Sequence, residues 1–217
     1  MIKAIIFDLD GTLLDTLEDL ANACNYGLRC CGFREHSVND YTRFVGNGRY
    51  ILIKRILPEE YKENEEVINK VLNYFDEYYG AHMIDMTKPY DGILEILQEL
   101  KSRNIKLAVV SNKPHEFAVD VVKKYFNNTF DVVYGHRVNH KTKPDPEAVN
   151  EAIELFKVNK AECLYVGDSD VDIQTAMNAQ VKSVGVAWGF RGTGELLEAG
   201  ADYIINEPKK IMKCLME

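Results

Sequence analysis

The sequence lacks long apolar runs, internal repeats and low-complexity tracts. No stretch approaches the roughly 18 apolar residues that a membrane-spanning helix needs. The first apolar stretch, at residues 4–7, is short and ends in acidic residues, which is not the pattern of a signal peptide. We therefore expect a cytoplasmic protein without a membrane partner.

Cysteine and positive charge are also scarce. The five cysteines are odd in number and lack the spacing of a metal site, so we expect reduced thiols rather than disulfides or zinc ligands. Lysine and arginine together number 26 against 34 aspartates and glutamates, which gives a net charge of −8. Because nucleic acids and anionic membranes bind basic faces, neither is expected as a partner.

The chain has 217 residues, of which 46% are hydrophobic, enough for one sizeable core and a small accessory domain. Apolar residues recur at helical spacing from residue 15 to about 83. After Pro89, helices alternate with strands at 105–110, 130–134, 163–166 and 181–186. This alternation predicts an α/β fold: a Rossmann-like parallel sheet core at 1–14 and 84–217, with an inserted all-helical domain at 15–83.

The first predicted strand ends in two acids. Asp8 and Asp10 follow a buried apolar run, and Gly11 then breaks the strand. Because side chains two apart on an extended chain point the same way, both carboxylates should project into one crevice at the strand's carboxyl end. Open α/β sheets bind ligands there. Taken alone, the pattern fits a solvated strand end equally well.

Two later segments carry residues suited to an anion. Ser111 and Asn112 end the strand at 105–110, and Pro114 begins the next helix, whose backbone N–H groups suit an anion. Lys143 lies on a stiff loop directly before another helix. Considered alone, Ser111 is more typical of a helix cap, and Lys143 of a solvated charge.

Two more acids follow the strand at 163–166. Asp168 and Asp172 lie at the start of a helix, where acids also act as caps. Because parallel strands share one carboxyl edge, these acids should converge with Asp8 and Asp10. Carboxylates in a partly dry cleft shift their pKa upward or hold a cation. Oxygen ligands alone indicate a hard cation, and Mg²⁺ suits a few carboxylates plus a phosphate. With a lysine and a hydroxyl, this is a phosphoryl-transfer site.

Four motifs in order, beginning with Asp8-Leu9-Asp10-Gly11-Thr12-Leu13, resemble those of the haloacid dehalogenase superfamily over essentially the whole chain. The resemblance implies that Asp8 is the nucleophile and forms an aspartyl-phosphate. Asp10 would protonate the leaving alcohol and then activate water. An acid at position 10 also favours phosphatases and mutases, because relatives that split carbon–halogen bonds lack it and ion-pumping relatives carry threonine.

The same resemblance assigns the remaining core residues. Catalytic binding of the transferring phosphoryl group would fall to Ser111 and Lys143. The expected substrate-binding residues of the core are Gly11, Thr12 and Asn112. The expected Mg²⁺ ligands are Asp8, the backbone carbonyl of Asp10 and Asp168, with Asp172 in support.

The helical insert resembles the cap domain of this superfamily, which closes over the nucleophile and supplies specificity. Its loop from Arg43 to Arg49 resembles that of phosphoglycolate phosphatases, and the expected substrate-binding residues are Gly46, Asn47, Gly48 and Arg49. Glycines let the backbone approach an anion, and Arg49 could meet a carboxylate or a second phosphate. The alternative is a flexible turn with a solvated arginine.

We therefore expect a Mg²⁺-dependent phosphatase acting on a small phosphorylated metabolite, with 2-phosphoglycolate as the first choice, as a monomer or dimer. β-Phosphoglucomutase-type enzymes share an arginine at the position of Arg49, but carry histidine where this chain has Leu20 and a cap lysine near Asp76. A pyrophosphatase or a nonspecific sugar-phosphate or nucleotide phosphatase also stays open. An inactive phosphometabolite sensor would lack a nucleophile, acid or metal ligand, and none is missing.

Two smaller expectations concern loops near the predicted site. Trp188 and Phe190 are expected to cover the last strands, with packing under the active edge as the alternative. His136 and His140, which precede Lys143, should be polar loop residues rather than zinc ligands.

Overall fold

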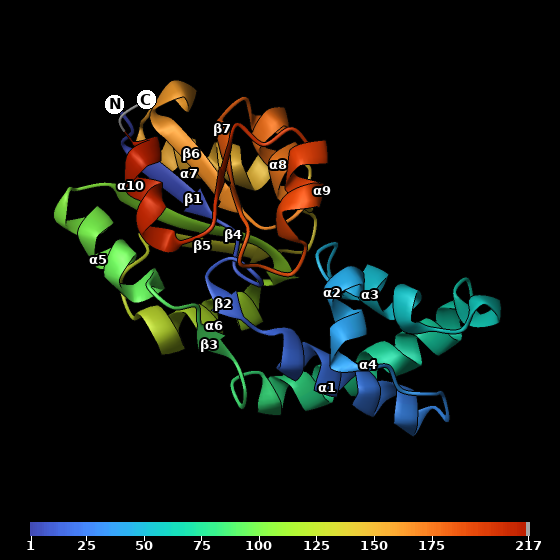
Figure 1. Cartoon of the computed structure of the whole chain (residues 1–217). Coiled ribbons are helices and arrows are strands. Elements are labelled where there is room, and N and C mark those ends of the chain that lie inside the picture. The colour runs from blue at the N-terminus through green and yellow to red at the C-terminus, as the bar shows by residue number, and fades with distance from the viewer. Residues whose placement is uncertain (216–217) are drawn as a thin grey trace. The chain divides into compact units, whose positions relative to one another are not determined.

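The computed structural model describes residues 1–215. The chain divides into two compact units (Figure 1): Met1–Asp15 together with the chain from Pro89 onward, and Thr16–Lys88. The predicted division lies at 14/15 and 83/84. The last two residues of the predicted core, 216 and 217, lie outside the described part.

The first unit contains a six-stranded sheet in the order β5-β4-β1-β6-β7-β8. All neighbouring strands are parallel, so the predicted parallel α/β core is confirmed. The strands are β1 (Ala4–Phe7), β4 (Lys106–Pro114), β5 (Val132–His136), β6 (Cys163–Gly167), β7 (Lys182–Val186) and β8 (Tyr203–Ile205).

Strand β1 lies in the middle of this sheet and is buried throughout. Its last residue, Phe7, is in register with Val109 of β4 and Val166 of β6. A continuous apolar run is what a strand covered on both faces requires. The register brings the ends of β1, β4 and β6 to the same edge.

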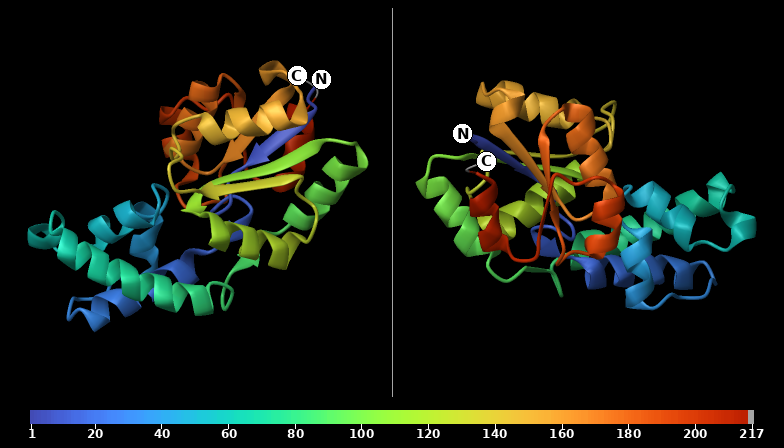
Figure 2. Two further views of the ribbon diagram at one scale, coloured as in Figure 1. Left: turned by 180° about the vertical axis from the view of Figure 1, so that it is seen from behind. Right: turned by 45° about the horizontal axis from the view of Figure 1, so that its top comes forward.

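Helices cover both faces of the sheet (Figure 2). The helices of this unit are α5 (Ile93–Ser102), α6 (His115–Phe126), α7 (Glu147–Phe156), α8 (Asp170–Ala179), α9 (Gly192–Glu198) and α10 (Ile211–Cys214). On one face, α7 and α8 pack against the strands, with Val149 and Ala176 in the same buried cluster as Ile6 and Tyr165. The βα alternation therefore gives a three-layered core around β1.

Strand β4 is longer than predicted. The predicted strand ends at 110 and the predicted helix starts at Pro114, but the chain stays extended to Pro114, and α6 starts at His115. The pairing with β5 shifts register between Val110 and Pro114. The extra extended residues, Ser111 to Pro114, are polar or lack an N–H donor, so apolar periodicity could not reveal them.

The second unit is built of helices, as the apolar spacing predicts. They are α1 (Leu17–Cys30), α2 (Tyr41–Phe44), α3 (Arg49–Ile56) and α4 (Glu65–His82). Helices α1 and α4 pack closely: a Cβ at Gly27 would lie 2.9 Å from the carbonyl oxygen of Val71. Phe75 and Tyr79 of α4 are buried and stacked, with ring centroids 5.2 Å apart. The aromatic stripe is therefore core, as expected.

The second unit extends to Lys88 because of one buried acid. Asp19 of α1 accepts hydrogen bonds from the backbone N–H of Met86 and from both the N–H and the hydroxyl of Thr87. Apolar periodicity ends with the helix, whereas these bonds hold the following segment to the same unit. Beside this boundary, β2 (Leu14–Asp15) and β3 (Lys88–Pro89) form a separate two-stranded sheet.

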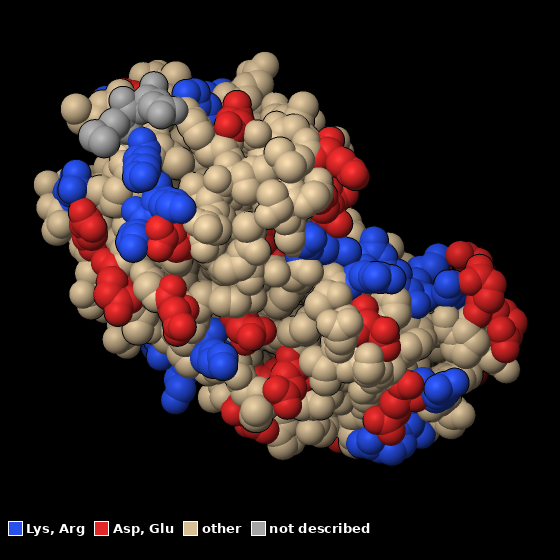
Figure 3. All heavy atoms as spheres, viewed as in Figure 1, with Lys and Arg blue, Asp and Glu red and all other residues tan. Residues whose placement is uncertain are grey.

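The surface carries mixed charge. Acidic and basic side chains are interspersed over the face that Figure 3 shows. Among the described helices, none combines the length and the apolar character needed to span a membrane.

Candidate active site

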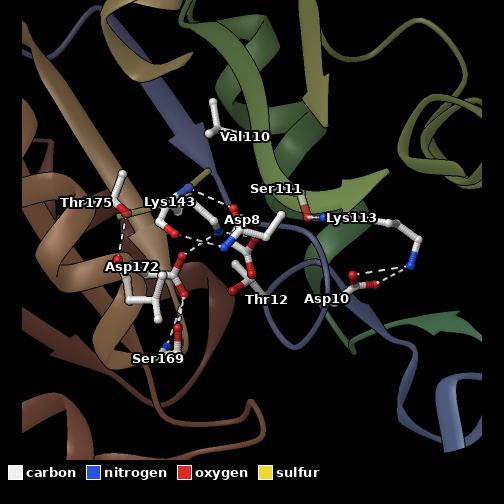
Figure 4. A network of polar contacts seen from close by, with 12 residues as sticks. Asp8, Asp10, Thr12, Val110, Ser111, Lys113, Lys143, Ser169, Asp172 and Thr175 are labelled. Carbon is white, nitrogen blue, oxygen red and sulfur yellow. Dashed lines mark hydrogen bonds and ion pairs between the residues drawn. The ribbon is translucent and has the colours of Figure 1, made fainter. Parts of the chain in front are cut away.

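The site begins directly after the central strand. Asp8 follows β1, and its backbone N–H donates to the carbonyl of Val166 at 2.8 Å. Its carboxylate is buried, and Lys143 Nζ donates to its Oδ1 at 2.6 Å (Figure 4). The two residues are 135 positions apart in the chain. The sheet therefore brings a buried carboxylate and an ammonium group together, as the sequence predicts.

Three of the four predicted acids converge. One carboxylate oxygen each from Asp8, Asp168 and Asp172 lie within 4.8 Å of one another, and all three residues are buried. Asp168 follows β6, and its carboxylate accepts from the backbone N–H of Phe190 at 2.7 Å and from the Thr12 hydroxyl at 3.5 Å.

Asp172 has hydrogen bonds to both of its oxygens. Oδ1 accepts from Lys143 Nζ at 2.8 Å and from the Tyr165 hydroxyl at 3.3 Å. Oδ2 accepts from the N–H and the hydroxyl of Ser169, which completes a capping box at the start of α8. Asp172 therefore fixes the Lys143 ammonium as well as the helix.

The electrostatic balance of this cluster is negative, with three carboxylates around one ammonium. Burial is the main cause that raises the pKa of Asp8 to about 7; Lys143 opposes the shift and Asp172 adds to it. Burial and the neighbouring acids raise the pKa of Asp168 well above its usual range. Burial alone would lower the pKa of Lys143, but Asp172 and Asp8 raise it well above its usual range.

This balance fits a divalent cation. A cation beside Asp8 and Asp168 would favour their ionised forms and offset the desolvation that raises their pKa values. The cluster offers only oxygen ligands, which hard ions such as Mg²⁺ prefer. The carboxylates of this edge can therefore hold such an ion.

Asp10 does not join the cluster. Its carboxylate is paired with Lys113 Nζ at 3.0 and 3.2 Å, on the far side of Ser111 from Asp8 (Figure 4). The charge of Asp10 nevertheless acts on Asp8 and contributes to raising its pKa, although β1 itself ends at Phe7. The expectation that both carboxylates project into one crevice stays a prediction.

The end of β4 holds three polar side chains with separate partners. Ser111 lies between Asp8 and Asp10 in Figure 4, and its hydroxyl accepts from the Lys113 N–H at 3.3 Å. Asn112 is buried and hydrogen-bonded to the backbone of Lys143. The side chain predicted to bind substrate thus holds the loop that carries the lysine.

That loop is also fastened to α7. Arg137 donates to Glu151 at 2.8 Å, while His140 Nδ1 and the Lys141 N–H contact Glu147 at 2.9 and 3.0 Å. His140 thus has two acidic partners on α7, Glu147 and Glu151. Lys143 therefore extends from a loop held at both ends.

Several residues at this edge escape sequence reasoning. Trp188 Nε1 donates to the carbonyl of Thr12 at 3.0 Å and the Phe190 N–H donates to Asp168, so the contacts favour the alternative in which these residues pack at the active edge. Between them, a Cβ at Gly189 would lie 2.2 Å from the Cβ of Asp168. A Gly between two aromatics was the only local signal of this close approach. Tyr165 and Lys113 had none, because the hydrogen-bond partners of Tyr165 lie on β4 and α8 and Asp10 is 103 positions away from Lys113.

The predicted cap-loop residues lie in the second unit. Gly46 and Gly48 have φ values of +120° and +81°, so the loop uses glycine where the backbone requires it. Arg55 donates to Asn47 Oδ1 at 2.7 Å and Arg49 forms an ion pair with Asp76. This loop is therefore an ordered turn whose arginine is paired with an acid of α4.

A parallel sheet that gathers acids and a lysine at its carboxyl edge defines the class of α/β phosphoryl-transfer enzymes. The model of the haloacid dehalogenase-like hydrolases matches residues 5–186, and the chain belongs to this family.

Similar proteins cover nearly the whole chain. A phosphoglycolate phosphatase of Aquifex aeolicus is 30% identical over 216 residues, covering 98% of this chain and 96% of that protein. One of Vibrio vulnificus is 34% identical over 224 residues, covering 99% and 96%. A crystal structure of a protein from Lactobacillus delbrueckii subsp. bulgaricus matches with a TM-score of 0.92 and 34% identity over 98% of both chains. With this family and these relatives, the protein is a phosphoric monoester hydrolase.

Proposed function

We propose that the protein is a Mg²⁺-dependent phosphatase that hydrolyses small phosphomonoesters through an aspartyl-phosphate on Asp8, with 2-phosphoglycolate as the preferred substrate. The observation that carries this proposal is the contact of Lys143 with Asp8 inside a buried carboxylate cluster. The activity of the named relatives supports the choice of substrate.

In the first half of the reaction, an oxygen of Asp8 forms a bond to phosphorus as the bond between phosphorus and the ester oxygen breaks. Lys143 holds Asp8 by one carboxylate oxygen and supplies positive charge where the phosphoryl oxygens gather. The Ser111 hydroxyl donates a hydrogen bond to the transferring phosphoryl group. Asp10 gives a proton to the departing alkoxide, which leaves as the alcohol.

In the second half, Asp10 takes a proton from water as the water oxygen attacks phosphorus. The bond from phosphorus to Asp8 breaks, which releases inorganic phosphate and restores the carboxylate. Each proton that Asp10 gives is thereby recovered, so the cycle is balanced.

Asp8, Asp168 and the backbone carbonyl of Asp10 would hold Mg²⁺. The ion supplies charge neutralisation of the phosphoryl oxygens when bound. Asp172 would support this arrangement through its hydrogen bond to Lys143 rather than as a direct ligand, because Lys143, Tyr165 and Ser169 already use its oxygens.

The helical domain, predicted at 15–83, would act as a cap that excludes water and selects the substrate. For Arg49 to meet a substrate carboxylate or phosphate, it would exchange or share its partner Asp76. The substrate would be a small phosphorylated metabolite in the cytoplasm, and the enzyme would act as a monomer or dimer.

The nucleophile is tested by Asp8→Asn, with Asp120→Asn on the exposed side of α6 as the matched control. We expect Mg²⁺-dependent hydrolysis of p-nitrophenyl phosphate to be abolished by the first variant and retained by the second. A fully active Asp8→Asn enzyme would overturn the assignment.

The substrate is tested by measuring kcat/KM side by side for 2-phosphoglycolate, β-glucose 1-phosphate, pyrophosphate and nucleoside monophosphates. We expect 2-phosphoglycolate to be among the best. Conversion of β-glucose 1-phosphate to glucose 6-phosphate would instead indicate the mutase, and a best rate with pyrophosphate the pyrophosphatase.

A further inference from the structure

Lys113 is a buried charged residue to which the reaction above gives no role. It lies near the end of β4, and only 3% of its side chain is exposed. Its ammonium group contacts both carboxylate oxygens of Asp10, at 3.0 and 3.2 Å. A lysine at such a place is expensive to bury, because the charged form loses its hydration. The cost of burying this ammonium group suggests that Lys113 has a function in the site.

The position of the ammonium follows from its neighbours on the strand. Ser111, two residues earlier, lies on the side of Asp8 in Figure 4, whereas the side chain of Lys113 runs to the other side and ends at Asp10. The Lys113 N–H also donates to the Ser111 hydroxyl. One strand end thus places a hydroxyl beside the nucleophile and a cation beside the acid.

Asp10 marks where the leaving group lies, and this step rests on the proposed function. To protonate the ester oxygen, the carboxyl group must approach it to about 2.8 Å. Since Nζ is 3.0 and 3.2 Å from the two oxygens of Asp10, the ammonium lies within about 6 Å of the ester oxygen. Lys113 is therefore next to the part of the substrate that is not the phosphate.

In 2-phosphoglycolate, a single methylene carbon separates the ester oxygen from the carboxylate. The carboxylate thus falls within the distance that Lys113 can reach. An ammonium carries three N–H donors and can bridge two carboxylates, here Asp10 and that of the substrate. In β-glucose 1-phosphate the same place would hold neutral ring atoms and hydroxyls, which gain less from a buried cation.

We propose that Lys113 is the specificity-determining residue of the core unit, which recognises an anionic group on the carbon that bears the ester oxygen. The substrate class is then the phosphate esters of 2-hydroxy acids. Arg49, the cation that the cap loop suggests for this role, is engaged with Asp76. Selection for a carboxylate therefore does not depend on the cap arginine alone.

The test uses two substrates that differ only at the group in question: 2-phosphoglycolate and 2-hydroxyethyl phosphate, in which CH₂OH replaces the carboxylate. In Lys113→Met and Lys113→Gln, we expect the ratio of kcat/KM for the first substrate over the second to fall at least about tenfold, as for the loss of one ion pair. Lys113→Arg should restore most of the ratio. Lys123→Met, on the exposed side of α6, is the matched control and should leave the ratio unchanged.

A second measurement separates recognition from positioning of Asp10. Binding of intact 2-phosphoglycolate to Asp8→Asn should weaken at least tenfold when Lys113→Gln is added, while 2-hydroxyethyl phosphate binds nearly as before. If both substrates lose kcat/KM and affinity equally, or neither does, Lys113 has no part in specificity and the inference is overturned. Failure of the proposed function would show differently, as a wild-type enzyme that hydrolyses 2-phosphoglycolate poorly.

Discussion

Asn112 binds Lys143 at both backbone groups: its Oδ1 accepts from the Lys143 N–H at 2.8 Å, and its Nδ2 donates to the Lys143 carbonyl at 3.1 Å. The amide group of Asn112 thereby binds the backbone of Lys143 as a neighbouring strand would. It fixes a loop that is 31 positions away in the chain. The contact also bears on Asp8, the proposed nucleophile, because the same lysine donates to its carboxylate.

Asn112→Ala should therefore act through Lys143. We expect kcat to fall about ten- to a hundredfold with little change in KM, and the free energy of unfolding to fall by about 2 kcal/mol, because two buried hydrogen bonds are lost. Steady-state kinetics and thermal unfolding measure the two effects, with the exposed Asn128→Ala as the control. A rise in KM alone would show that Asn112 binds the substrate directly, as the sequence suggests.

Lys143→Met removes the only ammonium group that is hydrogen-bonded to Asp8 or Asp172 in the described part of the chain. Activity should fall at least a hundred- to a thousandfold, the usual loss for one preorganised donor at a developing charge. The metal-free protein should also be less stable, since three buried carboxylates are left with less compensation. Lys141→Met, 73% exposed, is the matched control, and equal losses in both variants would contradict the role of Lys143.

The stability of the metal-free protein should depend on the ionisation of Asp8. Burial raises the pKa of Asp8 from 3.8 to about 7, so the folded state binds a proton more tightly than the unfolded state. The stability that this proton supplies is fully present below the unfolded pKa and is lost as the pH rises from about 4 to about 7. Asp8→Asn has no carboxyl group at this position, so its stability does not include a contribution from this proton.

In EDTA, the Tm of Asp8→Asn minus that of the wild type should therefore increase across this pH range. Asp120→Asn should give a constant difference. A difference for Asp8→Asn that shrinks with rising pH would mean that the pKa of Asp8 is lowered rather than raised.

The convergence of Asp8, Asp168 and Asp172 could be predicted because it needs only local signals. A buried apolar run identifies a parallel strand, and the residues that follow such strands share one edge. The place of Lys143 was also predicted, although the side chain of Asn112 that fixes its loop was assigned to the substrate. A contact between a strand-end side chain and the backbone of a distant loop depends on the path of that loop. Residue spacing in the sequence does not reveal this path.

What the sequence did not indicate has the same origin. Asp10 lies three residues past the end of β1, and nothing near it in the sequence indicates that its carboxylate is paired with Lys113. Lys113 of β4 and Asp10 are 103 positions apart, and the hydrogen bonds of Asp19 to Thr87 hold the end of the second unit. Each depends on partners distant in sequence, for which neither residue carries a local signal.

Magnesium should stabilise the protein through Asp168. At pH 7.5, millimolar Mg²⁺ should raise the Tm of the wild type, because an ion that binds only the folded state stabilises it. The shift should disappear in Asp168→Asn and persist in Asp170→Asn, which changes an exposed neighbour of the same helix start. An equal shift in both variants would place the ion elsewhere.

The loop that carries Lys143 should depend on α7. Glu147 contacts His140 and the Lys141 N–H, so Glu147→Ala removes these contacts to the middle of the loop. The substitution changes none of the site residues. We expect kcat to fall about three- to tenfold, because a less ordered loop presents the ammonium less often in the productive position. The free energy of unfolding should change by less than about 1 kcal/mol, since these contacts are partly exposed. Glu154→Ala, on the exposed side of α7, controls for a general effect on the helix. If kcat is the same in both variants, the hydrogen bonds of Asn112 alone are enough to position Lys143.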